Sequence, residues 1–223
     1  MTAAPATSDM GTTAAAPLTI ADPAPLGLAA FGLTTLVLSC INTGWVGAVN
    51  EPIVLALAIP LGGGVQILAG MWAFRRGSTF AATAFSAYGA FWISFFLIVQ
   101  YFAGAVVAGT AKALGPGATT AQIAAAAGDH LNVSLGLYLF AWGVFTAYMF
   151  LASLAGAKAI QLVFFLLTLT FFALAIGKWS ASESWTHIGG FLGVLTAVGA
   201  LYTSFADLAN ANFKRTVLPT GAP

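Results

Sequence analysis

Charged residues are scarce in this chain. Only 6% of its 223 residues are Asp, Glu, Lys or Arg, and 60% are hydrophobic. An average soluble domain is about a quarter charged. Together with a mean hydropathy of +0.94, this composition excludes an ordinary soluble domain and predicts an integral membrane protein. The formal net charge of +1 also leaves no basic surface that could bind nucleic acid.

Cysteine and histidine are almost absent as well. Cys40 is the only cysteine, so no intrachain disulfide can form. The two histidines, His130 and His187, lie far apart in the sequence and make a weak case for a metal site. The chain has no paired-histidine metal helix, nucleophile elbow, phosphate-binding loop or CxxC motif. We therefore predict no catalytic residues, no metal and no cofactor.

Residues 1–21 contain no Lys or Arg and lack the apolar core of a signal peptide, so we expect a flexible, uncleaved tail. The segments that follow are apolar nearly all round and about 20 residues or longer, which favours membrane-spanning helices over the alternating strands of a barrel. The sequence thus predicts an all-α membrane domain over 22–215 and a C-terminal tail over 216–223. The expected helices are 26–47, 53–74, 80–108, 131–153, 158–177 and 185–207.

The basic residues are unevenly distributed between the two sides of these segments. Lys112 and Lys178 lie on one side, and the other five of the seven lie on the side of the termini. The positive-inside rule then places both termini in the cytoplasm. The longest connection, 109–130, lies on the opposite side. Asp129 and His130 at its end either line an external vestibule or cap the next helix in solvent.

Small residues recur at helical spacing in two segments, which predicts close contacts between helices in the membrane. Gly62 and Gly70 share one face of the second segment with Gln66, and Gly189, Gly193 and Ala197 share one face of the sixth.

The first segment has a polar face. Asp22 can cap its start, where Pro23 and Pro25 lose no helical hydrogen bond. Residues at spacings of three or four then share one side of the helix. They are Phe31, Thr34, Thr35, Leu38 and Asn42. This face either lines a pathway for a solute, or its threonines bond back to carbonyls of their own helix.

Few polar groups lie inside the spans, and no charged residue lies clearly at the middle of one. Pumps and proton-coupled carriers commonly keep an ionisable residue there. His187, near a helix end, can titrate near neutral pH, so it either carries a proton or is a hydrogen-bonded packing residue. An uncharged, partly polar interior suits a small solute. The most polar positions are Asn42, Gln66, Gln100, Gln161 and His187.

The stretch 22–28, Asp-Pro-Ala-Pro-Leu-Gly-Leu, resembles the Asn-Pro-Ala-Pro-Leu-Gly-Leu signature of the acetate uptake transporter family, the succinate–acetate permease-like proteins. Asp22, Pro23, Pro25 and Gly27 carry this signature here. Further blocks follow in the same order as in the family. They are 31–35, 63–70, 77–80, 83–92, 142–146, 161–165 and 215–219.

This resemblance implies a six-helix protomer with cytoplasmic termini, assembled as a homohexamer in which each protomer has its own pathway. The family moves acetate and related short carboxylates. Its pathway narrows at a phenylalanine, a tyrosine and a leucine, which match Phe31, Tyr88 and Leu167. A dry constriction of this kind blocks ions by expelling water.

A carboxylate could pass such a constriction in two ways. The anion could accept hydrogen bonds from Thr34, Thr35, Asn42 and Tyr88, or acetic acid could cross in its neutral form. Anion channel and proton-linked permease both stay open, and succinate is a further candidate substrate. We place the substrate pathway along Thr34, Thr35, Asn42, Gln66 and Gln161.

The chain departs from the family pattern at two positions. The signature asparagine is Asp22, and a glutamate usual before the Gly-Asn-Thr-Phe-Gly block is Ala73. If that glutamate helps couple protons in relatives, this chain does without it. An alternative function is a membrane sensor or adaptor that responds to acetic acid without significant flux. A plasma membrane and a bacterial inner membrane are equally consistent with the sequence.

Overall fold

A computed structural model describes residues 20–221, and the N-terminal tail predicted over 1–21 lies almost wholly outside these residues. Every regular element in the described part of the chain is helical. Six helical rods are long and apolar enough to cross a membrane, which confirms the predicted fold class. The first rod is α1 (Ala24–Asn42). The second consists of η1 (Ala48–Asn50), α2 (Pro52–Leu57), the π-helical η2 (Ala58–Val65) and α3 (Gln66–Arg76), and the third of α4 (Thr79–Leu97), the π-helical η3 (Ile98–Phe102) and α5 (Ala103–Leu114). The last three rods are α6 (Thr120–Ser153), α7 (Lys158–Trp179) and α8 (Glu183–Phe213).

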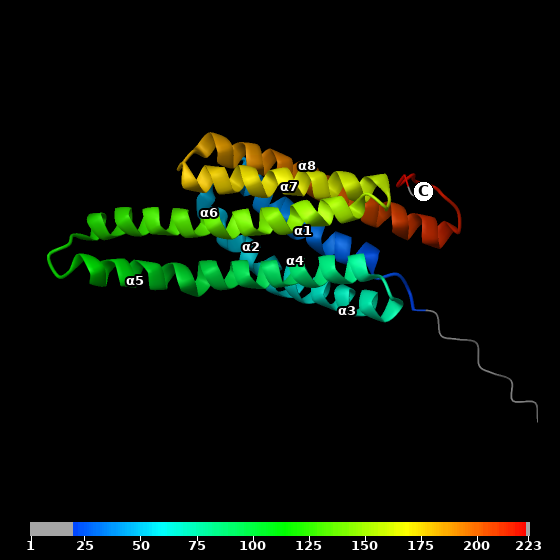
Figure 1. Ribbon diagram of the computed structural model, residues 1–223, viewed down its shortest axis with the longest axis horizontal. Helices are drawn as coiled ribbons and strands as arrows, with labels where there is room; N and C mark the ends of the chain where they lie inside the picture. The colour runs from blue at the N-terminus through cyan, green and yellow to red at the C-terminus, as the bar shows by residue number, and fades with distance from the viewer. Residues whose placement is uncertain (1–19, 222–223) are drawn as a thin grey trace, which may run out of the picture.

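The rods lie side by side in an elongated bundle (Figure 1). Helix α8 packs against α1 and α7, α7 packs against α6, and α3 packs against α4. The start of α1 and the C-terminal segment lie at the same end of the bundle, whereas the turn between α5 and α6 lies at the opposite end (Figure 1). An even number of spans produces this arrangement, so both described ends of the chain lie on one side.

The connection expected over 109–130 is mostly helical. Helix α5 continues to Leu114 and α6 begins at Thr120, so only 115–119 link them. Alanines have the highest helix propensity, and the 121–127 stretch forms the first turns of α6. Gln122 and Thr119 form a capping box at its start. Asp129 therefore lies within α6 rather than at its cap.

Close helix contacts depend on glycine, as the spacing of small residues predicts. A Cβ built on Gly89 of α4 would lie 2.9 Å from the carbonyl oxygen of Gly63 in η2. A Cβ on Gly70 of α3 would lie 2.9 Å from the backbone nitrogen of Ser86. Real side chains do not tolerate such distances from backbone atoms, so these glycines let the second and third rods approach each other closely.

The C-terminal segment folds back onto the bundle. The side-chain oxygen of Asn210 accepts hydrogen bonds from the backbone nitrogens of Val217 and Leu218, at 2.6 and 3.0 Å. The backbone nitrogen of Lys158 donates to the carbonyl oxygen of Gly221 at 3.1 Å. The segment thereby satisfies donors in the first turn of α7 that have no partner within their own helix.

Candidate functional site

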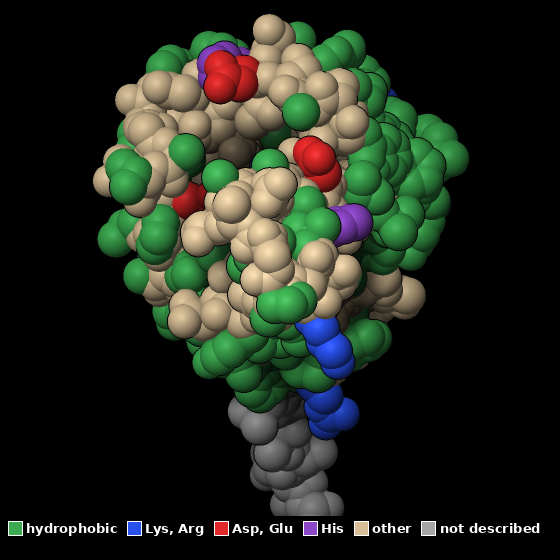
Figure 2. All heavy atoms as spheres, turned by 90° about the vertical axis from the view of Figure 1, so that its left-hand side faces the viewer, with side chains coloured by type: hydrophobic (Ala, Val, Ile, Leu, Met, Phe, Trp, Pro, Cys, Tyr) green, Lys and Arg blue, Asp and Glu red, His purple; other side chains and the backbone are tan. Residues whose placement is uncertain are grey.

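Two cavities enter the bundle from its opposite ends. The first, which we call the proximal cavity, lies near the chain ends between α1, α4, α7 and α8 and has a volume of about 380 Å³. The second, the distal cavity, lies toward the α5–α6 end and has a volume of about 290 Å³. Figure 2 looks onto the distal end, where the surface is hollowed and acidic and histidine side chains lie around the hollow.

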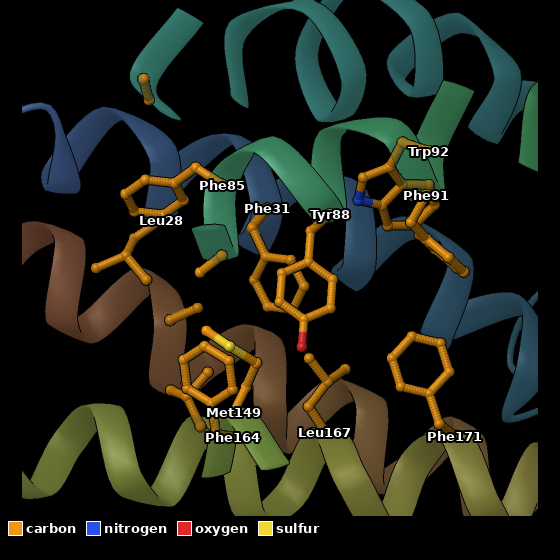
Figure 3. Packing of buried hydrophobic residues seen from close by; sticks show 14 of the residues in the cluster. Leu28, Phe31, Phe85, Tyr88, Phe91, Trp92, Met149, Phe164, Leu167 and Phe171 are labelled. Atoms are coloured by element: carbon orange, nitrogen blue, oxygen red, sulfur yellow. The ribbon is translucent and has the colours of Figure 1, made fainter. Parts of the chain in front are cut away.

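Phe31, Tyr88 and Leu167 line both cavities, and no other residue is shared between the two linings. They come from α1, α4 and α7, and they are 6%, 3% and 4% exposed. The ring centroids of Phe31 and Tyr88 lie 5.7 Å apart. Figure 3 shows the two rings side by side with Leu167 next to them. We call these three residues the neck, because they form the partition between the cavities.

Aromatic rings and one hydroxyl hold Tyr88 in place. Its ring packs edge-on against Phe145 of α6, with a centroid distance of 5.5 Å, and its centroid lies 6.1 Å from that of Phe164 of α7. The phenol oxygen lies 2.9 Å from Oγ1 of Thr146, also on α6. These contacts from two neighbouring helices restrict the Tyr88 side chain to one position in the neck.

The distal cavity carries most of the polar groups. Oγ1 of Thr35 and Nε1 of Trp92 are both buried without a hydrogen-bond partner among residues 20–221, and both residues line this cavity. Each atom is a hydrogen-bond donor at the edge of the cavity that no described residue satisfies. The other polar lining residues are Ser39, Asn42, Glu51, Tyr138, Thr170, Lys178 and Thr186.

The sequence analysis did not identify Lys178 as a pathway residue, although its spacing from Leu167 along α7 indicates that role. Leu167, Thr170, Phe171, Leu174 and Lys178 recur at helical spacing and all line the distal cavity. Lys178 thus lies three turns beyond the neck on the same face of α7. Once Leu167 is placed in the pathway, this spacing is the signal that could have found it.

The proximal cavity is almost entirely apolar. Apart from the neck tyrosine, its polar lining residues are Gln66, Ser153 and Asp207. Oε1 of Gln66 is buried and has no hydrogen-bond partner in the described part of the chain. Asp207 is half-buried on α8 and is the charged residue of this lining. The two cavities therefore differ in chemistry although they meet at the same three side chains.

The residues placed along the pathway from the sequence separate into two groups. Thr35 and Asn42 line the distal cavity and Gln66 lines the proximal cavity. Thr34 lines neither: its hydroxyl donates to the carbonyl oxygen of Ala30 at 2.9 Å. Gln161 also lines neither, and its amide nitrogen donates to the carbonyl oxygens of residues 154 and 156. It supports the loop between α6 and α7, which borders the proximal cavity.

The histidines lie away from the cavities. His187 is exposed on α8 beside Gly44, in the turn that follows α1, and lines neither cavity. Asp129 and His130 are exposed on α6 and also line neither. Within residues 20–221, no group of three His, Cys, Asp or Glu side chains is close enough to hold a metal ion.

The signature motif around Asp22 anchors the start of α1. The Asp22 carboxylate accepts a hydrogen bond from the backbone nitrogen of Ala24 at 2.9 Å and pairs with Arg76 at the end of α3 at 3.3 Å. The carbonyl oxygen of Pro25 accepts a hydrogen bond from the hydroxyl of Ser204 on α8 at 2.6 Å.

The other two motif residues pack tightly. Pro23 is buried, and any Cβ on Gly27 would collide with the ring of Phe85 on α4. The motif therefore fixes α1, and with it Phe31, against three other helices. Asp22 thus lies one residue before the N-cap, Pro23, rather than at the cap expected from the sequence, and it serves as the acceptor for Ala24 and the ion-pair partner of Arg76.

Six apolar helices around two cavities that meet at a dry aromatic neck are typical of a membrane channel or carrier for a small solute. The family model for the GPR1/FUN34/yaaH family matches residues 6–221. The chain belongs to this family, which confirms the resemblance seen in the sequence.

Its relatives include proteins named for carboxylate transport. The chain is 39% identical over 203 residues to the succinate-acetate/proton symporter SatP of Escherichia coli, covering 91% of this chain and 96% of that protein. It is 39% identical over 209 residues to acetate permease A of Emericella nidulans, covering 89% of this chain and 65% of that one. The solved structure of the bacterial acetate channel SatP superposes with a TM-score of 0.75 at 37% identity, over 91% of this chain and all of that one.

Proposed function

We propose that this protein conducts acetate and related short-chain monocarboxylates across a membrane, through the two cavities and the neck between them. The observation that carries this proposal is that cavities from opposite ends of the bundle share only Phe31, Tyr88 and Leu167. A path through the protomer must pass these three side chains. The names of the relatives support a carboxylate as the solute, with succinate as a further substrate.

The same proposal includes features taken from the family resemblance and the charge distribution. Both termini face the cytoplasm, because five of the seven basic residues lie at their end of the bundle. The protomers assemble as a homohexamer in a bacterial inner membrane or a plasma membrane. Each protomer has its own conduit, as the family resemblance implies. The protein acts without catalysis or a cofactor.

Uptake of labelled acetate into proteoliposomes tests the proposal. The protein should raise uptake above that of protein-free liposomes, and Phe31→Ala should raise it further and admit succinate more readily, because the neck becomes wider. Phe205→Ala is a matched control, since Phe205 is exposed on α8 and lines neither cavity. Wild-type protein that carries no acetate above the protein-free background would contradict the proposed function.

A further inference from the structure

The direction of the hydrogen bond at the neck follows from its geometry. Oγ1 of Thr146 lies 2.9 Å from the phenol oxygen of Tyr88 and donates at 2.7 Å to the carbonyl oxygen of Trp142, one turn earlier in α6. A carbonyl oxygen cannot donate, so both hydrogen bonds form together only when the single hydroxyl proton of Thr146 goes to Trp142. In that arrangement the phenol of Tyr88 donates to Thr146.

This direction leaves the neck without a hydrogen-bond donor for a solute. With its proton bonded to Thr146, Tyr88 offers only oxygen lone pairs, and the side chains of Phe31 and Leu167 have no donor at all. A carboxylate anion stripped of water there would receive no hydrogen bond from these side chains, at a high desolvation cost. A neutral carboxylic acid loses far less on desolvation, and its own O–H can donate to the Tyr88 oxygen.

Resting on the proposed function, we infer that Thr146 makes the neck selective for the protonated acid by holding the hydroxyl proton of Tyr88. Thr146 is fully buried and lines neither cavity, so it acts through Tyr88 as a positioning residue. Its side chain determines which form of the solute the neck can bind without changing the bore.

The donors on the distal side of the neck explain where the anion is held before it is protonated. Oγ1 of Thr35 and Nε1 of Trp92 have no hydrogen-bond partner among residues 20–221, and a small side-chain movement that exposes either atom lets it donate to a carboxylate anion in the distal cavity. The anion takes up a proton from the aqueous phase there, crosses the neck as the neutral acid, and releases the proton on the other side. One proton then moves with each acetate, and no protein side chain has to be protonated.

Thr146→Val tests this assignment, because valine keeps the shape of threonine and removes the acceptor of the Tyr88 proton. The freed phenol can then donate to an anion in the neck. Acetate uptake driven by membrane potential at equal pH should rise by about tenfold relative to uptake driven by a pH gradient, the effect of one hydrogen bond to an ion. Thr146→Ser keeps the hydroxyl and should restore the wild-type ratio.

Two further variants separate this effect from a general loss of packing. Thr196 of α8 is also buried, donates to the carbonyl oxygen of Leu192 at 2.8 Å and lines neither cavity, so Thr196→Val should leave the ratio unchanged. In a Tyr88→Phe background no phenol can be freed, so adding Thr146→Val should have no effect.

A ratio in Thr146→Val equal to that of wild type and Thr196→Val would overturn the inference while leaving the proposed function intact. A rise that persists in the Tyr88→Phe background would also overturn it. Wild-type protein that carries no acetate under either driving force would remove the proposed function and this inference together.

Discussion

The two cavities present a carboxylate with different surroundings. The distal cavity is lined by Thr35 and Trp92, whose buried donors have no partner in the described part of the chain, and by the opposite charges of Lys178 and Glu51. The proximal cavity is apolar except for a few groups, with Gln66 as its buried amide. A pore that selects its solute by size alone would not require this difference in polarity between the two linings. From this contrast we expect the solute to bind on the distal side and to pass through the proximal side without a specific binding site.

The contrast is sharpest at the neck, because the distal donors lie next to side chains that offer a solute no hydrogen-bond donor. Thr35 and Phe31 are one turn apart on α1 and line the same cavity. A solute can therefore exchange its water for protein hydrogen bonds in the distal cavity before it enters a region without donors. On this account the distal side determines affinity and the neck determines which form crosses.

Blocking the junction should have the largest effect. Leu167→Trp places a larger ring between the two cavities, so acetate uptake into proteoliposomes should fall by about tenfold or more. The exposed Leu169 lies on the same helix and lines neither cavity, so Leu169→Trp is the matched control. Equal uptake by both variants would show that solute does not pass Leu167.

The distal donors should affect affinity more than maximal rate. Thr35→Val removes one unpaired hydroxyl and keeps the shape of the side chain. The acetate concentration that half-saturates uptake should rise by about tenfold, as expected for one hydrogen bond to a charged group. Thr34→Val provides a sharp comparison, because the neighbouring hydroxyl is bonded to Ala30. Similar shifts in both variants would rule out a specific contact with Thr35.

The charged lining residues should have the smallest effect. Lys178 and Glu51 line the same cavity with opposite charges, so their potentials largely cancel for an anion bound there. Lys178→Gln and Asp207→Asn should each change uptake at low acetate concentration by less than about twofold. A severalfold loss in Lys178→Gln, together with a gain in Glu51→Gln, would instead show that these charges determine how much anion the distal cavity binds.

The sequence predicted the class of fold and part of the pathway. Apolar length alone predicted six helices, and spacing placed Phe31, Thr35 and Asn42 on one face of α1. Spacing also placed Thr34 on that face, because neighbouring residues of a helix differ by only about 100° in direction. Which of two adjacent threonines faces the cavity depends on how α1 packs against η2, where Thr34 contacts Gly62.

Other features depend on tertiary contacts that sequence spacing does not encode. Tyr88 and Leu167 were placed only by family resemblance. Thr146 forms a hydrogen bond with Tyr88, 58 positions away in the chain, and no local sequence pattern predicts that pairing. Gln161 looked like a pathway residue because it is polar within a span, whereas it bonds backbone carbonyls of the preceding loop. An amide within a span is equally consistent with either role until its partners are known.

The most direct test of the account is whether the two cavities open to opposite sides of the membrane. Cys40 lines neither cavity and can be replaced by alanine, after which Ala81→Cys marks the proximal cavity and Leu135→Cys the distal one. A small membrane-impermeant thiol reagent is applied to vesicles of either orientation. Ala81→Cys should react only from the side of the termini and Leu135→Cys only from the other side. Reaction of both cysteines from the same side would contradict a conduit divided at the neck.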